Sequence, residues 1–400
     1  MVGNSTVKYD IVVIGAGPAG LCTGISAAKE GCKVLIIERR SEIGSPIRTS
    51  GGSWIAEMQE LSIPAPLYNP INKITFRSSN EEASFSSNPP KNCVLNVRGL
   101  YQHLAEKALN LGANISVRTS AKELILEGSN VRGVKIVKFS EQKHVRADVV
   151  IDASGYSHFS HRDIGIKVPD RFAEGVEYEL YAPHFVQNES FLFVGDRICR
   201  SGYGWIFPCG NSRARIGVGI IKPDNPQKPI SVLNKFISTS NLIEGSYEIE
   251  FHHGFLPCWG YLKKNVFNGL IIIGDAAGHL PLLAGEGIRF AMKSGLVAGK
   301  VAAEAVKNSD SSEKRLSRFE KEWLDKELLS FKISLYINKK ISQFNDKQWD
   351  KGIRYLSKIK SEHFFHLLRS DFSAPLIFGL AATNPEFLKQ LPKALIKKLF

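Results

Sequence analysis

The fold is decided near the N-terminus, where residues 9–20 read YDIVVIGAGPAG. A short apolar run, typical of a buried strand, leads into the pattern G-x-G-x-x-G formed by Gly15, Gly17 and Gly20, and a helix over residues 21–30 is predicted to follow. In such a turn the first glycine permits a tight bend, the second lets the backbone approach a pyrophosphate, and the third allows the helix to pack closely on the strand. The free N–H groups at the start of the helix would face the anion.

An acid ends the next apolar run. Residues 33–38 read KVLIIE, and Glu38 stands where a carboxylate accepts hydrogen bonds from a ribose diol. The strand, the glycine turn, the helix and the acid together predict a dinucleotide site; the alternative is a glycine-rich turn that binds nothing. An acid at this position disfavours a 2′-phosphate, and Pro18 and Ala19 inside the turn are more typical of FAD than of NAD.

A second strand–turn–helix motif lies far downstream. Residues 268–279 read NGLIIIGDAAGH, and residues 280–288 read LPLLAGEGI before a helix predicted to reach about residue 307. Asp275, at the end of the strand, can accept a hydrogen bond from a ribityl hydroxyl. The backbone N–H groups of the turn at residues 285–288 would face electron-rich atoms at the edge of a flavin, because the start of a helix stabilises negative charge. Taken alone, the motif would also describe an ordinary strand–turn–helix.

These motifs resemble those of a known superfamily. Together with DVVIDASG at residues 148–155, they resemble the p-hydroxybenzoate hydroxylase superfamily of FAD proteins. The resemblance covers about residues 8–310. Within the superfamily, three segments are similar to the geranylgeranyl reductase family: GSPIRTSGG at residues 44–52, NVRGLYQHL at residues 96–104, and YGWIFPCG at residues 203–210 followed by RIGVG at residues 215–219.

The resemblance implies FAD as the cofactor and assigns its contacts. Arg98 is also favoured by its chemistry, since a guanidinium pairs well with pyrophosphate or ribityl oxygens; the alternative is an arginine exposed on a helix. The residues that the resemblance assigns to cofactor binding are Gly15, Gly17, Ala19, Gly20, Glu38, Thr49, Ser50, Gly52, Arg98, Ala121, Asp275, Gly287 and Ile288.

Two residues are candidates for a catalytic role. Where many archaeal family members have a cysteine beside the flavin, this chain has Thr49, whose hydroxyl donates hydrogen bonds but cannot match the acidity of a thiol. His279 is the second candidate, as an acid, because imidazole exchanges protons near neutral pH. The alternative for His279 is a residue that fixes the loop before the following helix.

Three aromatic residues are predicted to line the substrate. Tyr203, Trp205 and Phe207 alternate along one predicted strand and therefore share one face. An aromatic face beside a flavin suits an apolar, polyene-like substrate, whereas the alternative is an ordinary hydrophobic core.

The predicted fold class is α/β, with a discontinuous Rossmann-like FAD-binding domain, an inserted antiparallel-sheet substrate domain and a helical C-terminal region. The chain of 400 residues is too long for one ordinary domain. Short alternating runs between residues 172 and 257 predict antiparallel strands. After residue 310, hydrophobic periodicity and the lack of Gly and Pro up to Gly352 predict helices. The predicted boundaries are 1–60, 91–165 and 265–310 for the FAD-binding domain, 61–90 and 166–264 for the substrate domain, and 311–400 for the helical region.

Composition limits location and partners. There is no apolar run of about 18 residues that would span a membrane, and the N-terminus lacks the features of a signal peptide. The six cysteines are scattered without a C-x-x-C pair, so no metal site is predicted, and a reduced, cytoplasmic location is favoured.

Positive charge is concentrated in the last quarter of the chain. Residues 311–400 hold 18 Lys+Arg and 10 Asp+Glu residues, so they carry +8 of the net charge of +13. Leucines and lysines alternate over Lys389–Phe400 in a pattern that suits a helix at a membrane surface, with a helix packed on its own protein as the alternative. Nucleic acid is not predicted as a partner, because no recognised nucleic-acid motif accompanies the charge. Peripheral contact with the inner face of the membrane is the resulting hypothesis.

The leading functional hypothesis is an FAD-dependent reductase of C=C double bonds in geranylgeranyl-type lipids or their precursors. The alternatives are a flavin-dependent monooxygenase or halogenase acting on an aromatic or polyketide-like substrate, and a non-catalytic flavin electron carrier. The sequence holds no second G-x-G-x-x-G pattern. Electrons are therefore expected from outside, from NADPH, from a ferredoxin as electron-donor protein, or from a quinol.

Overall fold

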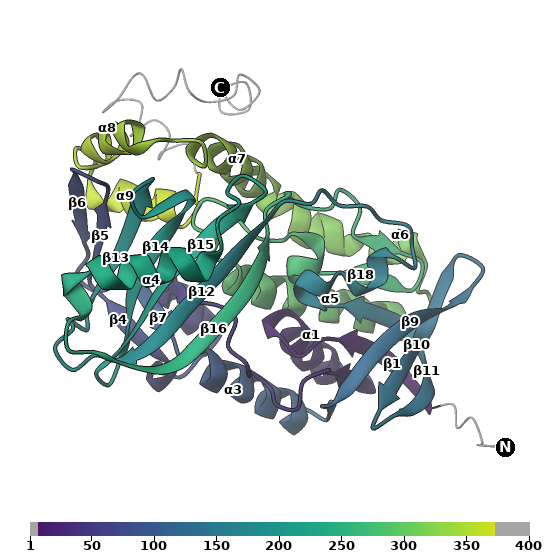
Figure 1. Ribbon diagram of the computed structural model, residues 1–400. Helices are drawn as coiled ribbons and strands as arrows, with labels where there is room; N and C mark the ends of the chain where they lie inside the picture. The colour runs from purple at the N-terminus through teal and green to yellow at the C-terminus, as the bar shows by residue number, and fades with distance from the viewer. Residues whose placement is uncertain (1–6, 373–400) are drawn as a thin grey trace.

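The computed structural model describes residues 7–372, which form two halves joined along their length (Figure 1). One half holds a mainly parallel sheet with helices, and the other holds a large, mainly antiparallel sheet. The predicted α/β fold class is confirmed.

The sheet of the first half is built from segments far apart in the sequence. Its main path runs β17-β18-β11-β1-β2-β8. The strands β18, β11, β1, β2 and β8 are parallel to one another along it, whereas β17 is antiparallel to β18. The carboxyl ends of β1, β2, β11 and β18 therefore meet at one edge of the sheet, which is where ligands bind in open α/β folds. The strands are β1 Val7–Ile14, β2 Val34–Ile37, β8 Asn114–Ser116, β9 Thr119–Glu127, β10 Asn130–Lys138, β11 Glu141–Asp152, β17 Val266–Phe267 and β18 Leu270–Ile272.

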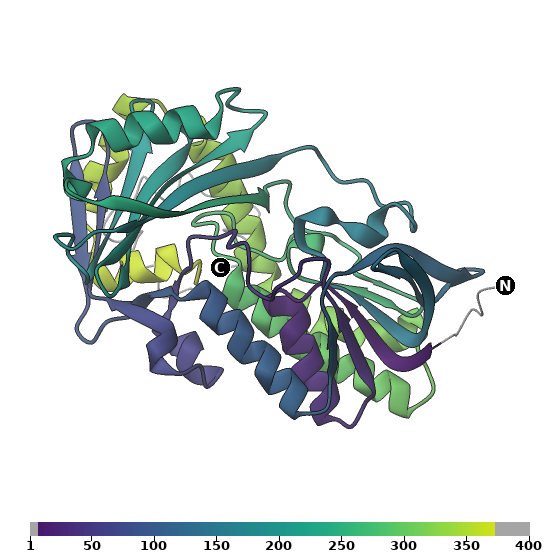
Figure 2. The same cartoon turned by 60° about the horizontal axis from the view of Figure 1, so that its bottom comes forward.

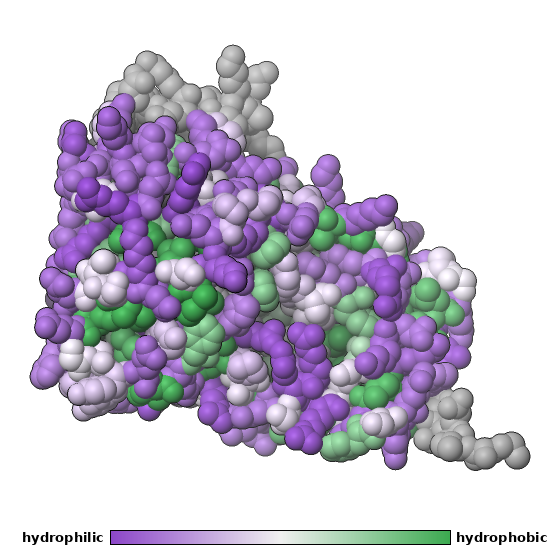
Figure 3. Space-filling view, viewed as in Figure 1, coloured by the Kyte–Doolittle hydropathy of each residue, from purple (hydrophilic) through white to green (hydrophobic). Residues whose placement is uncertain are grey.

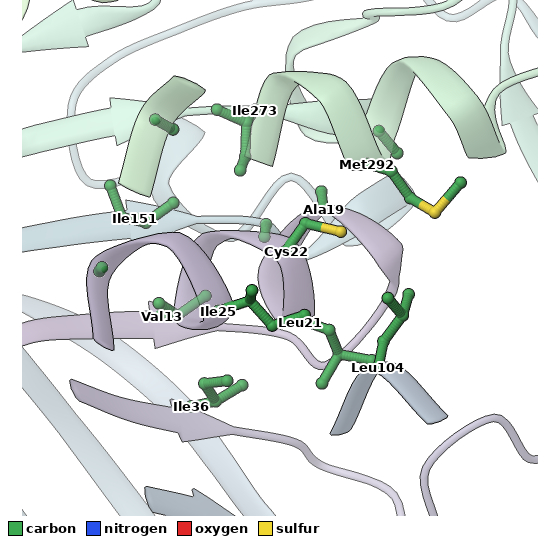
Figure 4. Close-up of a cluster of buried hydrophobic side chains, with 14 of the residues drawn as sticks. Val13, Ala19, Leu21, Cys22, Ile25, Ile36, Leu104, Ile151, Ile273 and Met292 are labelled. Carbon is green, nitrogen blue, oxygen red and sulfur yellow. The ribbon is translucent and has the colours of Figure 1, made fainter. Parts of the chain in front are cut away.

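Helices cover one face of this sheet, and the β9–β10 hairpin covers the other. The helices are α1 Pro18–Lys29, α3 Val97–Asn110 and α5 Ile288–Lys307. In Figure 4, Leu21 and Ile25 of α1 point toward Val13 and Ile36 of the sheet, while Cys22 lies on the side of Met292 in α5.

Small residues let α1 and α5 approach closely. A Cβ added at Gly295 of α5 would lie 2.2 Å from the carbonyl oxygen of Ala19, and one added at Gly299 would lie 2.5 Å from that of Thr23. Both distances are far below van der Waals contact, so only glycine permits this packing. The close contact fixes the starts of both helices relative to the sheet edge.

The second half is a seven-stranded sheet in the order β16-β12-β15-β14-β13-β5-β6. Its pairs are antiparallel except for β5 with β13. Helix α4, Pro229–Thr239, covers the outer face through an apolar cluster, and the other face turns toward the first half (Figure 2). The strands are β5 Lys73–Arg77, β6 Glu82–Ser86, β12 Phe172–Tyr181, β13 Glu189–Gly195, β14 Cys199–Gly210, β15 Arg213–Lys222 and β16 Tyr247–Pro257.

A small sheet and a run of helices join the two halves. The order of this sheet is β3-β7-β4, and α2 follows β3 directly. Phe319 and Trp323 pack into the core of the first half. The helices α8 and α9 pack onto β5 and β6 of the second half. In that contact the ring of Phe364 stacks on that of Phe85, with the two ring centroids 3.7 Å apart. The elements are β3 Gly52–Trp54, α2 Ile55–Glu60, β4 Tyr68–Ile71, β7 Asn92–Leu95, α6 Glu313–Leu316, the π turn η6 Glu320–Leu324, α7 Asp325–Ile341, α8 Asp346–Leu356 and α9 Ser361–Leu368.

The surface is largely hydrophilic on the face seen in Figure 3. Apolar residues gather most over the antiparallel-sheet half, and smaller groups of them lie over the other half. Among the described helices, none is both long and apolar enough to cross a bilayer. The segment Lys389–Phe400, predicted as a membrane-surface helix, lies outside the described residues.

Candidate active site

A cavity of about 1270 Å³ lies between the two halves. It begins at the glycine turn after β1 and extends to the helices α8 and α9. Pockets for a single small ligand typically measure about 300–1,000 Å³, so this space is large enough for a cofactor and a substrate together.

Most of the predicted site residues line this cavity, although they come from segments separated by more than two hundred positions. The structure thus brings together the glycine turn, the loop after β2, the β14 aromatics and the start of α5. The residues concerned are Gly15, Gly17, Ala19, Glu38, Thr49, Ser50, Gly52, Tyr203, Trp205, Phe207, Asp275, Gly287 and Ile288.

The three glycines of the first turn differ in their surroundings. Gly15 has φ +104°, and a Cβ there would lie 2.4 Å from the carbonyl oxygen of Ala153. A Cβ on Gly20 would lie 1.9 Å from the carbonyl oxygen of Gly15, so this glycine allows helix and strand to touch. At Gly17 an added Cβ would meet no atom within 4 Å. The space beside Gly17, at an α1 start that has no side-chain cap, fits a pyrophosphate.

Glu38 is fixed beside this turn. One carboxylate oxygen accepts a hydrogen bond from the backbone N–H of Ala16 at 3.0 Å, and the other accepts from that of Arg40 at 2.8 Å. Each oxygen keeps a further lone pair. Because the side chain lies in the cavity wall, these lone pairs can accept hydrogen bonds from ribose hydroxyls.

Asp275 follows β18 and faces the same space. None of the described residues donates a hydrogen bond to its carboxylate, and its half-buried position raises its pKa to about 6 through desolvation. The start of α5 lies alongside, since a Cβ added at Gly287 would be 3.5 Å from Asp275 Oδ1, and α5 also lacks a side-chain cap. An unpaired carboxylate beside free helix N–H groups fits a ribityl chain and the electron-rich edge of a flavin. With the glycine turn and Glu38, the donors and acceptors fit FAD.

The loop after β2 is held in place from the antiparallel sheet. Arg215 Nη1 donates hydrogen bonds to the carbonyl oxygens of Ser50 at 2.8 Å and Leu95 at 3.2 Å. On the other side, a Cβ at Gly254 of β16 would lie 2.1 Å from the carbonyl oxygen of Arg48. Thr49 and Ser50 are therefore fixed at the cavity wall, where a flavin ring would lie beside them.

The three β14 aromatic residues that were predicted to line the substrate lie in the cavity wall. Tyr203, Trp205 and Phe207 lie on one face of the strand, with ring centroids 5.5 Å and 6.3 Å apart along the series. The Tyr203 hydroxyl donates to the carbonyl oxygen of Ala284 at 2.9 Å, and Trp205 Nε1 donates to Glu177 Oε2 at 2.9 Å. Because the polar atoms are satisfied, the ring faces are available for apolar contact.

Sequence reasoning missed the far end of the cavity. There the wall consists of apolar side chains from β5, β13, α8 and α9, among them Phe76, Leu192, Trp349 and Phe364. The apolar residues Phe364, Phe365, Leu367 and Leu368 were the available signal, but their pattern alone does not distinguish a cavity wall from a core. This end can enclose a long hydrocarbon chain.

A buried ion cluster supports the start of α5 and was also missed. Glu57 is fully buried, and its Oε1 pairs with Arg289 Nη1 at 3.3 Å and with Arg369. Arg289 Nε donates to Glu286 Oε2 at 2.5 Å. The cluster thereby ties α2 and the end of α9 to the turn whose backbone lines the cavity.

Four predicted residues do not line the cavity: Gly20, which packs α1 on the strand, and Arg98, Ala121 and His279. Arg98, at the start of α3, pairs with Glu42, and Arg98 Nε lies 2.7 Å from Glu42 Oε1. The side chain of Arg98 is half exposed. Ala121 lies in the β9–β10 hairpin, opposite Ile136. Their contacts with FAD stay predictions that this geometry does not support.

His279 is enclosed by protein. Its Nε2 lies 3.0 Å from Asn265 Oδ1, its ring stacks near Phe331, and burial lowers its pKa to about 3. A neutral imidazole without access to the cavity is poorly placed to give a proton to a substrate, so the geometry favours a role in fixing the loop.

The missing cysteine at position 49 has no substitute. Cys93 and Cys258 line the cavity, but burial raises the pKa of both thiols, that of Cys258 to about 12. Neither thiol is a ready acid at neutral pH. Within residues 7–372, no group of three or more His, Cys, Asp or Glu side chains is arranged to hold a metal ion.

Comparison with known proteins supports the same interpretation. The family model described as FAD dependent oxidoreductase matches residues 10–162, and the one described as geranylgeranyl reductase catalytic domain matches residues 173–255. A digeranylgeranylglycerophospholipid reductase of Methanococcoides burtonii is 33% identical over 335 residues, covering 79% of each chain. A relative of the same name from Methanosarcina acetivorans is 31% identical over 418 residues, covering 96% of this chain and 98% of its own.

Solved structures of other proteins are also similar to this chain. A geranylgeranyl bacteriochlorophyll reductase-like protein from Thermoplasma acidophilum superposes with a TM-score of 0.88 at 25% identity, covering 99% of this chain and 100% of that chain. A flavin-dependent brominase variant reaches a TM-score of 0.68 at 19% identity, covering 87% of this chain and 94% of that chain. The second similarity shows a shared fold alone.

Proposed function

Because the chain belongs to the geranylgeranyl reductase family of FAD-dependent oxidoreductases, we propose that it reduces C=C double bonds of geranylgeranyl-type lipids. The observation that carries this proposal is the single cavity that joins a dinucleotide cradle to an aromatic and aliphatic chamber. A reaction between a flavin and an isoprenoid chain requires both in one space from which water is excluded.

The cradle residues would hold the cofactor. Gly15 and Gly17 would receive the pyrophosphate, Glu38 the adenosine ribose, Asp275 a ribityl hydroxyl, and the start of α5 at Gly287 the ring edge. FAD, once reduced, supplies the hydride for the double bond, and the protein supplies orientation and a dry environment.

The substrate would lie with its chain toward α8 and α9. Tyr203, Trp205 and Phe207 offer ring faces to the double bonds, and the apolar side chains at the far end exclude water from the remaining chain. The polar contacts of the Tyr203 hydroxyl and the Trp205 indole fix these two rings. The hydrocarbon chain of the substrate would therefore pack against a rigid aromatic surface.

The domain boundaries, the external reductant and membrane contact belong to the proposal as well. We assign residues 1–60, 91–165 and 265–310 to FAD binding and residues 61–90 and 166–264 to the substrate, and we expect NADPH, a ferredoxin or a quinol as the source of electrons. The net charge of +8 over residues 311–400 supports peripheral binding to an anionic membrane that holds the lipid substrate.

Anaerobic reoxidation of the flavin tests the proposal. The purified yellow protein is reduced with dithionite, freed of excess reductant and mixed with a digeranylgeranyl glycerophospholipid in detergent. We expect the oxidised flavin spectrum to return with the lipid and to stay absent with a saturated phytanyl lipid. If the flavin reoxidises only with oxygen and yields a hydroxylated or halogenated product, the protein is a monooxygenase or halogenase instead. A flavin that no substrate reoxidises indicates an electron carrier.

A further inference from the structure

The reduction of a double bond needs a proton as well as a hydride, and the catalytic candidates identified from the sequence do not provide one. His279 is enclosed by protein, and Thr49 does not ionise near neutral pH. The cavity wall holds another titratable pair, Glu177 on β12 and His252 on β16, which face each other across neighbouring strands.

Carboxylates face both ring nitrogens of His252. Nδ1 lies 2.8 Å from Glu177 Oε1, and Nε2 lies 3.1 Å from Glu250 Oε2. An ionised carboxylate only accepts hydrogen bonds, so both nitrogens must carry a hydrogen to satisfy this arrangement. The geometry therefore selects the protonated imidazolium, the form that can give up a proton.

The pair connects the cavity to solvent. The side chains of Glu177 and His252 are each only 4% exposed, whereas that of Glu250 is 44% exposed. Glu177 also accepts the hydrogen bond of the Trp205 indole, so its carboxylate lies directly beside the proposed substrate wall. The series Glu250, His252, Glu177 thus leads from the surface to the cavity.

The surrounding charges favour the imidazolium. Burial by itself lowers the pKa of His252, but the hydrogen bonds that His252 donates to Glu177 and Glu250 outweigh burial, and the net pKa is raised. Arg215 on β15 opposes this effect, although it is itself paired with Glu179 at 3.0 Å and lies 4.0 Å from Glu177. Two further titratable groups interact with Glu177, the Tyr203 hydroxyl and the Cys209 thiol. Burial raises the pKa of each to about 12, so both stay neutral.

We propose that His252 and Glu177 supply the proton for double-bond reduction and that Glu250, which accepts the hydrogen of Nε2, stabilises the imidazolium. This inference rests on the proposed function and names the residues that complete its chemistry. One alkene carbon gains a hydride and its neighbour gains a proton, so the C=C bond becomes C–C, with two new C–H bonds. The proton leaves His252 Nδ1 through Glu177, and the neutral imidazole keeps its hydrogen at Nε2 against Glu250. Nδ1 regains a proton from solvent through Glu177 once the product has left the cavity. The electron pair comes from the reduced flavin.

The first test removes the donor. We expect His252→Gln to keep its flavin and its rate of reduction by dithionite, while the rate at which the reduced protein saturates a digeranylgeranyl glycerophospholipid falls about 100-fold or more. His144→Gln, in β11 of the other sheet, is the matched control and should behave as the wild type.

The second test lowers the pKa of His252 while keeping the histidine in place. The imidazolium is the active form, so the single-turnover rate should be full at low pH and fall as pH rises through the pKa of His252. Glu250→Gln removes one of the contacts that raise this pKa, so the fall should begin at lower pH. In the flavin-free protein, NMR titration should place the pKa of His252 above the ordinary value of 6.5 in the wild type and lower it in this variant.

The outcomes are distinct. If the wild type saturates the lipid and both variants keep its rate and pH profile, the proton-donor inference is wrong while the proposed function stands. Loss of flavin from His252→Gln, with an unshifted pH profile for Glu250→Gln, would assign the pair a structural role only. A flavin-loaded wild type that saturates no isoprenoid lipid would overturn the proposed function, and this inference with it.

Discussion

Replacing Asp275 by Asn should stabilise the flavin-free protein while weakening its hold on FAD. In the absence of cofactor the Asp275 carboxylate faces the cavity without a donor from the described residues, and desolvation raises its pKa from 3.8 to about 6. A carboxyl whose pKa is raised by folding makes the folded state less stable once the pH exceeds the unfolded value. Asparagine carries no charge and removes this cost.

The expected gain in stability follows from the size of the pKa shift of Asp275. A change from 3.8 to about 6 corresponds to about 3 kcal/mol at 1.36 kcal/mol per unit, an upper value because the half-buried carboxylate is partly screened by solvent. The gain in the free energy of unfolding should therefore be about 1–3 kcal/mol at pH 8 and should vanish near pH 4. Losing a hydrogen bond from a ribityl hydroxyl to a charged acceptor costs about 1.5–3 kcal/mol, so FAD should bind about 10- to 100-fold more weakly.

Two titrations measure these effects. Urea unfolding of the flavin-free protein between pH 4 and pH 8 reports stability, and calorimetric titration with FAD over the same range reports affinity. Wild-type affinity should decline as pH falls below about 6, where Asp275 takes up a proton, whereas the variant should lack this decline. Asp148→Asn, at a half-exposed acid in β11, is the control and should match the wild type. An Asn variant that binds FAD as tightly as the wild type would refute the assignment of Asp275.

Three further perturbations separate folding from cofactor and substrate chemistry. Gly17→Ala should keep the free energy of unfolding within about 0.5 kcal/mol of the wild-type value, because a Cβ there meets no atom within 4 Å. The same variant should bind FAD more weakly in a fluorescence titration. Gly20→Ala should instead lower the melting temperature, because its Cβ would clash with the backbone. Glu57→Ala should cost about 3–5 kcal/mol in urea unfolding, because two arginines lose their buried partner; a cost below about 1 kcal/mol would contradict the role of this cluster. Thr49→Cys should keep its flavin and match or exceed the wild-type rate of lipid reduction, and loss of flavin would show that the loop is wrongly assigned.

The parts of the site that are coded locally could be predicted from the sequence. Gly15, Gly17 and Gly20 act through backbone geometry within a few residues, so their spacing alone specifies the turn. Asp275 likewise follows directly from a strand end. Tyr203 and its alternate neighbours share a face because of strand periodicity, whatever the strand packs against.

The rest depends on contacts between distant segments, which periodicity does not encode. Arg215 holds the carbonyl oxygen of Ser50 across 165 positions, and Arg289 meets Glu57 across 232. His252 and Glu177 become neighbours only through the register of β16 on β12. A polar residue in a strand looks the same in sequence whether it faces solvent, a core or a cavity, and so the proton-donor pair and the far wall at α9 were visible only in the structure.

The central claim is tested most directly by the mass of a lipid after anaerobic incubation with the reduced protein. A digeranylgeranyl glycerophospholipid should gain the mass of two hydrogen atoms for each double bond saturated, with one flavin oxidised per bond. An unchanged lipid mass, with reduced flavin still bound, would contradict the claim that this protein reduces isoprenoid double bonds.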